Sequence, residues 1–142
     1  MSKSNTFEND WMKLIFNATP IANMADNAAT SPLTNLYVSL HTADPGEAGT
    51  QTTSEAAYAS YARVAVARTS GGWTITNNSA SPVADISFPA ATGGSETETF
   101  WAVGTASSGT GKILYSGAIS PTIVVSSGVT PKITTASTIT ED

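Results

Sequence analysis

Apolar residues near the start of the chain recur at the spacing of an α-helix. Positions i, i+4, i+7, i+8 and i+11 place five of them on one face: Phe7, Trp11, Leu14, Ile15 and Ala18. Asn5 followed by Glu8 resembles a capping box, which satisfies free N–H groups at a helix start. Pro20 cannot continue a helix, so the pattern predicts a short helix that ends near residues 17–19.

The predicted helix is strongly apolar on the side that carries Phe7, Trp11, Leu14 and Ile15, which we name the helix face. Such a face closes an open edge of the chain's own domain, or it docks on a neighbouring subunit. Both interpretations remain open at this point. The helix face is therefore the candidate partner-docking site of the chain.

Beyond a polar connection at residues 20–34, the pattern changes to the period of two that is typical of strands. Leu36, Val38 and Leu40 alternate with more polar residues, as in a half-buried strand. Alternating or short apolar runs bounded by turn residues predict eight strands, the last of them bent at a proline: residues 36–41, 63–66, 73–76, 84–88, 100–105, 112–118, 123–125 and 129–140.

Turn chemistry between these runs sets the predicted fold class. Asp44-Pro45-Gly46 and Ser70-Gly71-Gly72 favour bends, and residues 106–111 predict the tip of a hairpin. Many short strands with regular turns predict a mainly β fold, an antiparallel β-sandwich or jelly-roll of about eight strands with one short N-terminal helix. We expect two parts, the helix with its connecting arm at residues 1–34 and a β domain at residues 35–142.

The core of the β domain is predicted from the apolar positions of the strands. These positions are Leu36, Val38, Leu40, Val64, Val66, Ile86, Phe88, Val103, Ile113 and Ile123. A chain of 142 residues buries about two-thirds of its unfolded surface, so a core of this size needs no covalent staple.

Composition excludes several classes of function. The chain has no cysteine, which excludes disulfides, thiolate metal sites and thiol nucleophiles. Only 12% of its residues are charged, and six scattered Lys and Arg residues give no basic footprint for nucleic acid. No signal-peptide core or membrane-spanning apolar stretch is present in the sequence, so we expect a soluble protein made in a cytoplasm, without nucleic-acid or membrane partners.

Candidate catalytic residues are few. His41 is the only histidine and lies on the polar side of its predicted strand, where a hydrogen-bonded structural role is expected. Glu96 and Glu98, two residues apart, project on one face, and the acidic residues Asp44 and Glu47 share a loop; all four are expected to be solvated charges.

Two further motifs are weak. Residues 104–112 have the glycine interval of a phosphate loop, but a threonine stands where the lysine is required and a strand follows. Trp73 and Trp101 are expected in the core, although exposed tryptophans would form a sugar-stacking platform. The sequence therefore predicts no catalytic residue, no cofactor and no metal site.

One stretch of sequence carries a family resemblance. The run from Leu36 to Glu47, LYVSLHTADPGE, followed by Glu55 and by YARV at residues 61–64, resembles small virion structural proteins of tailed bacteriophages. Members are often labelled tail fibre or minor structural proteins. Weaker similarities at residues 87–90 and 104–117 extend the resemblance over most of the chain.

The resemblance implies a non-enzymatic virion protein, made in the host cytoplasm, whose partners are other virion proteins and copies of itself. Because nothing resembles a repetitive fibre shaft or a coiled coil, capsid decoration is the preferred location. A tail or tail-fibre attachment protein is the first alternative. A carbohydrate-binding module that uses Trp73 or Trp101 is the second.

Overall fold

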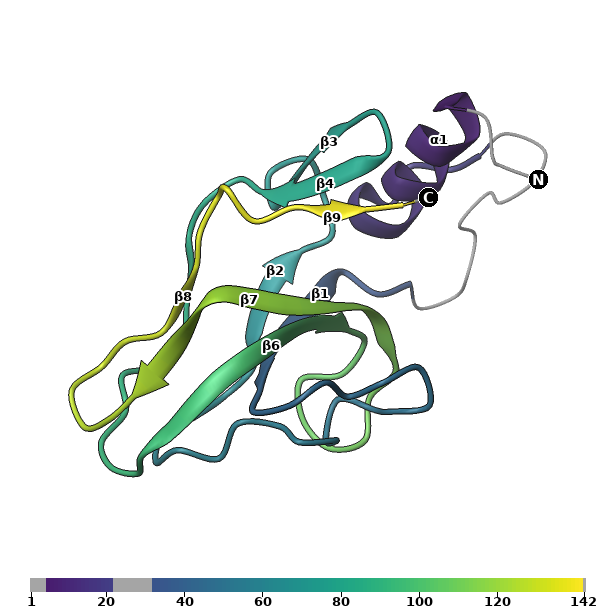
Figure 1. The fold of residues 1–142 in the computed structure, drawn as a ribbon. Helices are drawn as coiled ribbons and strands as arrows, with labels where there is room; N and C mark the ends of the chain where they lie inside the picture. The colour runs from purple at the N-terminus through teal and green to yellow at the C-terminus, as the bar shows by residue number, and fades with distance from the viewer. Residues whose placement is uncertain (1–4, 22–31, 142) are drawn as a thin grey trace. The chain divides into compact units, whose positions relative to one another are not determined.

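The computed structural model describes residues 5–21 and 32–141 of the chain (Figure 1). One helix, α1, spans Asn5–Asn17. Nine strands follow it in the described residues: β1 Asn35–His41, β2 Val64–Ala67, β3 Trp73–Thr76, β4 Ser79–Pro82, β5 Ile86–Ser87, β6 Glu96–Gly104, β7 Ile113–Val125, β8 Lys132–Ile133 and β9 Ile139–Thr140.

The chain folds into two compact units. Unit 1 comprises Met1–Asn35, Val66–Asp85 and Thr134–Asp142, and unit 2 comprises Leu36–Ala65 and Ile86–Ile133. The helix therefore shares a unit with β3, β4 and β9. The predicted division into residues 1–34 and 35–142 concerns independent folding and stays a prediction.

Unit 1 is built around the contact between α1 and a small sheet. Its strands are antiparallel in the order β3–β4–β9, and α1 packs on β3 and β4. Phe16 of α1 meets Trp73 of β3 edge to face, with ring centroids 4.7 Å apart. Both side chains are fully buried, so this aromatic pair forms the centre of the core of unit 1.

Unit 2 contains most of a four-stranded sheet in the order β2–β1–β6–β7. β1 pairs with β6 and β6 pairs with β7, both antiparallel. Residues 105–112 connect β6 to β7 as the predicted hairpin, and Thr105 N–H donates to the carbonyl of Lys112. A short β5–β8 pair completes the unit. Leu36, Val38 and Leu40 of β1 are buried in its core.

The mainly β, antiparallel fold with one helix is confirmed, and several strand predictions need correction. β7 continues through Pro121, where two strands were expected, because an edge strand tolerates a residue without an N–H. Residues 129–140 form two strands in different sheets, and the turn at Asn77-Asn78 leads into β4, which the pattern did not predict.

The predicted core is partly correct. Leu36, Val38, Leu40, Ile86, Phe88 and Val103 are buried, whereas Val64, Val66, Ile113 and Ile123 are only half-buried. The half-buried positions lie on β2 and β7, the outer strands of the sheet, each of which pairs with one strand among the described residues. Trp73 is buried as expected, but its partner at the centre of unit 1, Phe16, was in neither the predicted core nor the predicted helix face.

Candidate interaction surfaces and the buried polar network

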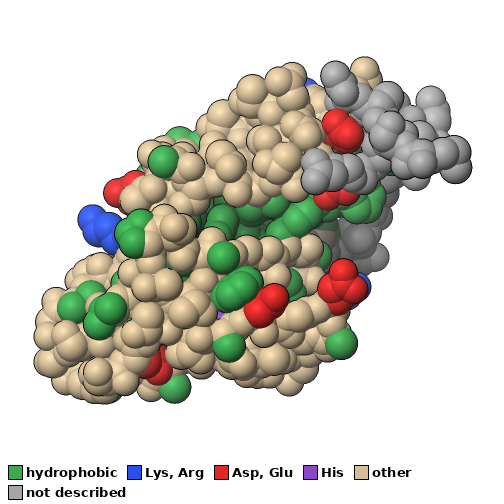
Figure 2. Space-filling model, in the orientation of Figure 1, with side chains coloured by type: hydrophobic (Ala, Val, Ile, Leu, Met, Phe, Trp, Pro, Cys, Tyr) green, Lys and Arg blue, Asp and Glu red, His purple; other side chains and the backbone are tan. Residues whose placement is uncertain are grey.

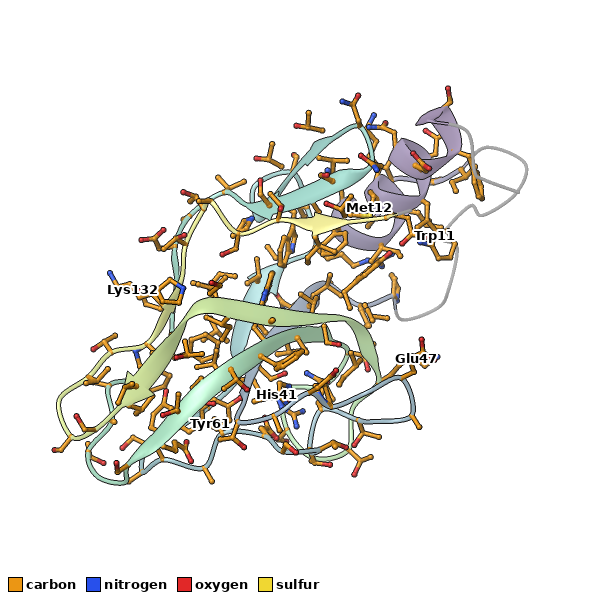
Figure 3. All side chains as sticks on the ribbon, viewed as in Figure 1. Trp11, Met12, His41, Glu47, Tyr61 and Lys132 are labelled. Carbon is orange, nitrogen blue, oxygen red and sulfur yellow. The ribbon has the colours of Figure 1, made fainter. Side chains whose placement is uncertain are left out.

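His41 is fully buried in unit 2 and has the hydrogen-bonded structural role that was expected of it (Figure 3). Its Nδ1 lies 2.8 Å from the carbonyl oxygen of Thr53, which can only accept, so Nδ1 carries the proton. Its Nε2 then accepts from the hydroxyl of Ser39 at 2.9 Å. Burial lowers the pKa of His41, which keeps the ring neutral in this arrangement. Both ring nitrogens are occupied, so His41 joins β1 to the following loop.

An ion pair connects the middle of the loop after β1 with the end of that loop. Arg63 donates from Nε to Glu55 Oε1 at 2.6 Å and from a terminal nitrogen to Oε2 at 2.8 Å, a bidentate arrangement. The Tyr61 hydroxyl donates to Glu55 Oε1 and accepts from the backbone N–H of Leu40. The Arg63 side chain is 2% exposed, so the pair lies largely outside water.

The same arginine reaches the hairpin between β6 and β7. Its terminal nitrogens donate to the carbonyl oxygens of Ala106 at 2.9 Å and Gly109 at 2.8 Å. Hydrogen bonding to Glu55 raises the pKa of Arg63, which keeps the guanidinium charged although it is buried. Arg63 thus fixes a turn that has no regular structure of its own.

Gln51 is a second buried connection, and no pattern in the sequence pointed to it. Its Nε2 donates to the carbonyl of Tyr37, and its Oε1 accepts from the N–H of Ala106. Gly104 and Gly111 flank its amide so closely that a Cβ on either would overlap the Gln51 side chain. Glycine at these positions reflects close packing at the hairpin base and not a phosphate loop.

Glu96 and Glu98 differ in environment despite their spacing. Glu96 Oε1 accepts from the backbone N–H groups of Ala57 and Tyr58, both at 2.8 Å. Glu98 is fully buried, and neither of its carboxyl oxygens has a hydrogen-bond partner. Burial, and then the nearby Glu96 carboxyl group, raises the pKa of Glu98 to about 8. The expectation of solvated charges is wrong for Glu98, which is a neutral acid at neutral pH.

These hydrogen bonds give a structural role to several polar residues of the motif between Leu36 and Val64. Asp44 Oδ1 accepts from Gly46 N–H at 2.9 Å, and Gly46 has φ +68°, as the predicted turn requires. His41, Glu55 and Arg63 are occupied as described above. The motif therefore holds a long loop, residues 42–63, against the sheet of unit 2.

The tryptophans do not form a stacking platform. Trp73 is fully buried and Trp101 is 7% exposed. A sugar ring stacks only on an accessible aromatic face, so the carbohydrate-binding interpretation based on these two residues is wrong. Trp73 Nε1 is also a buried donor without a hydrogen-bond partner, which is consistent with a position chosen by packing.

The helix face is divided between the core and the surface of unit 1 (Figure 3). The fully buried residues of α1 are Met12 and Phe16, four apart, and Glu8 lies one turn before them. Trp11 is 37% exposed, whereas Phe7, Leu14 and Ile15 are half-buried. The buried line of the helix is therefore rotated from the predicted face, and part of that face remains accessible to a partner.

Arg68, which belongs to a different segment of unit 1, caps the C-terminal end of α1. Its Nε donates to the carbonyl of Ile15 at 2.6 Å, and a terminal nitrogen donates to the carbonyl of Leu14. The last turn of the helix has no basic residue of its own, so Arg68 supplies the positive charge that a helix C-terminus favours. Sequence spacing gives no signal for this long-range cap.

An open groove of about 440 Å³ lies beside the start of β7 in unit 2. Its walls come from the loop after β1, from Phe100 of β6 and from four consecutive residues of β7: Asp44, Gly46, Glu47, Gly49, Phe100, Ile113, Leu114, Tyr115 and Ser116. The loop side is acidic, and the strand side is apolar or hydroxyl-bearing.

Charged side chains are few and scattered on the molecular face shown in Figure 2. Within the described residues, no three His, Cys, Asp or Glu side chains gather as a set of metal ligands. The described helix is also too short and too polar to cross a membrane. These features define a small β-rich protein whose polar clusters stabilise its own loops.

The comparison with protein families identifies the group. Residues 2–140 match the family described as Podophage GP4 fiber I protein gp80, so the chain belongs to this family of phage fibre proteins. The resemblance to tailed-phage virion structural proteins is thereby confirmed. Among curated proteins, no sequence matches the chain.

Proposed function

We propose that the protein is a non-enzymatic structural component of a tailed-phage virion and that it is built into the fibre assembly. The observation that carries the proposal is the match to the fibre family over residues 2–140. The structure adds that the motif shared with phage proteins is occupied in holding the loop at residues 42–63. A rigid loop scaffold is what an assembly protein needs in order to present fixed surfaces.

The arrangement of polar groups supports a non-enzymatic role. His41 has both ring nitrogens bonded inside unit 2, and Arg63 is paired with Glu55 and two carbonyl groups. Glu98 is closed off from solvent, so it has no access to a substrate. A catalytic acid or base must reach a proton on a bound substrate, and these groups do not.

Attachment to other virion proteins, or to further copies of the chain, is assigned to the exposed part of the helix face. Trp11 is 37% exposed, and Leu33, whose carbonyl accepts from Arg68 beside the end of α1, is 43% exposed. Exposed aromatic and aliphatic side chains on a sparsely charged surface favour burial against a partner. Such an interface should depend little on salt, because few charges are available for screening.

Capsid decoration is the second candidate, because the sequence contains no shaft-like repeat. The copy number per particle separates the two locations, since a decoration protein follows the symmetry of the capsid and a fibre protein that of the tail. We expect a few to a few dozen copies per virion by quantitative mass spectrometry, with immunogold label at the tail. Hundreds of copies with label over the head would overturn the fibre assignment.

A further inference from the structure

Glu96 and Glu98 of β6 form a pair of neighbouring carboxyl groups, which we name the carboxylate pair. Residues two apart on a strand project to the same face, and these two lie opposite Val125 and Ile123 in the register with β7. Val125 is fully buried, so the carboxylate pair lies on the buried face of this end of the sheet. Burial, and after it the carboxyl group of Glu96, raises the pKa of Glu98. The two carboxyl groups therefore lie close together within unit 2.

The carboxylate pair has no positive partner in the described part of the chain. Neither glutamate forms an ion pair there, and the buried Arg63 of the same unit is occupied by Glu55. Glu98 is 0% exposed, and both of its carboxyl oxygens lack a hydrogen-bond partner. A proton on Glu98 supplies one donor, which leaves the other oxygen without a partner. Buried polar atoms of this kind mark a place where a water molecule or an ion completes the structure.

Three carboxylate oxygens of the pair are available to a ligand. Glu96 Oε1 accepts from the N–H groups of Ala57 and Tyr58, and no described hydrogen bond reaches its Oε2. The other two are the oxygens of Glu98. Glu96 is half-buried, so solvent reaches the pair on its side. Carboxylate oxygens are the ligands that hard divalent cations prefer. Ca²⁺ binds them singly or in pairs in irregular geometry, whereas Mg²⁺ demands a near-ideal octahedron.

We propose that the carboxylate pair of Glu96 and Glu98 binds one Ca²⁺ ion, with water molecules completing the coordination of the ion. Such an ion supplies the positive charge that two carboxylates in apolar surroundings lack. It also joins β6 to the loop at residues 42–63, because Glu96 holds the backbone of Ala57 and Tyr58 in that loop. Two carboxylates are a small set of protein ligands, so the affinity belongs to the weak end of the range for calcium sites.

The test is isothermal titration calorimetry of the full chain with Ca²⁺ at pH 8.5. This pH lies above the pKa of about 8 of Glu98, so protons compete little with the cation. We expect one Ca²⁺ per chain with a Kd of about 0.1–1 mM, and a melting temperature that rises with the Ca²⁺ concentration. Mg²⁺ should bind about tenfold more weakly or worse. An absence of Ca²⁺ binding, or equal binding of Mg²⁺, would overturn the proposal.

Conservative variants locate the binding site. Glu98→Gln keeps the size of the side chain, and Glu96→Gln keeps the Oε1 acceptor for the backbone of the loop, so both should fold. Each variant should weaken Ca²⁺ binding about tenfold or more, because a ligand charge is lost. The double variant Asp44→Asn and Glu47→Gln changes an exposed acidic pair of the same unit and should bind Ca²⁺ like the wild type. Unchanged binding in a folded Glu98→Gln variant, or lost binding in the double variant, would contradict the assignment of the site.

Discussion

The guanidinium of Arg63 donates two hydrogen bonds, of 2.6 and 2.8 Å, to the carboxylate of Glu55. The Arg63 side chain is 2% exposed. Removing one partner of a buried pair leaves an uncompensated charge. It would also release the carbonyl groups of Ala106 and Gly109 at the hairpin.

Arg63→Ala should lower the free energy of unfolding by about 3–5 kcal/mol, measured by chemical denaturation. Arg63→Lys should also be destabilising, because a lysine cannot reproduce the bidentate geometry. Lys132→Ala, a change at an exposed position of the same unit, should stay within about 0.5 kcal/mol. If Arg63→Ala is as mild as this control, the pair does not hold the loop.

The packing of Gln51 between two glycines gives a second prediction. Gly111→Ala should destabilise the protein by about 1–3 kcal/mol, because the new methyl group overlaps the fully buried Gln51 amide. Gly71→Ala is the matched control, since its Cβ would meet nothing closer than 3.5 Å. In a double-mutant cycle, Gln51→Ala should relieve part of the cost of Gly111→Ala. Additive effects of the two changes would contradict the overlap.

Substitutions on the buried and the exposed side of α1 should distinguish a role in stability from a role in attachment to the virion. Phe16→Ala should cost about 3–5 kcal/mol in thermal or chemical unfolding, because it removes the fully buried partner of Trp73. Trp11→Ala should cost less than about 1 kcal/mol but reduce incorporation into virions, because its side chain is partly exposed. Thr6→Ala, at an exposed position of the same helix, should affect neither.

Truncation tests the same helix and the predicted boundary after residue 34. Residues 35–142 alone should unfold at a lower temperature than the full chain, because Met12 and Phe16 no longer cover β3 and β4. A native melting temperature for the fragment would instead support an independent β domain and a helix used only for docking.

Glu98 should make stability depend on pH. Its pKa rises from 4.5 in the unfolded chain to about 8 in the fold, so the folded state binds more protons between these values. The stabilisation of the fold that the raised pKa of Glu98 contributes is therefore fully present below pH 4.5, and it is lost as the pH rises to about 8. Glu98→Gln should remove this slope and be more stable than the wild type above pH 8, by about 2–4 kcal/mol.

Equilibrium unfolding of both proteins across pH 4–9 measures the difference. The comparison isolates Glu98 from His41, whose lowered pKa removes stability as the pH falls below 6.5. Thr97→Ala, at an exposed neighbour on β6, should keep the wild-type slope. Parallel curves for the wild type and Glu98→Gln would show that Glu98 is not held protonated.

Features that depend on neighbours in the chain could be predicted from the sequence alone. The end of α1 near Asn17, the turn at Asp44-Pro45-Gly46 and the hairpin at residues 106–111 all follow from local chemistry. Apolar alternation also located β1, because Leu36, Val38 and Leu40 face one side of a strand. The motif resemblance was sufficient to indicate a phage virion protein.

Which polar residues are buried depends on contacts between segments that are distant in the sequence. β1 lies between β2 and β6, and its residues from Val38 to His41 are all buried, so the alternation that marks a solvated face fails there. Ser39 and His41 are accommodated because each finds a hydrogen-bond partner within unit 2. A one-dimensional pattern records the side on which a residue lies but not what covers that side. Burial, and with it the protonation of Glu98, is decided by segments distant in the sequence.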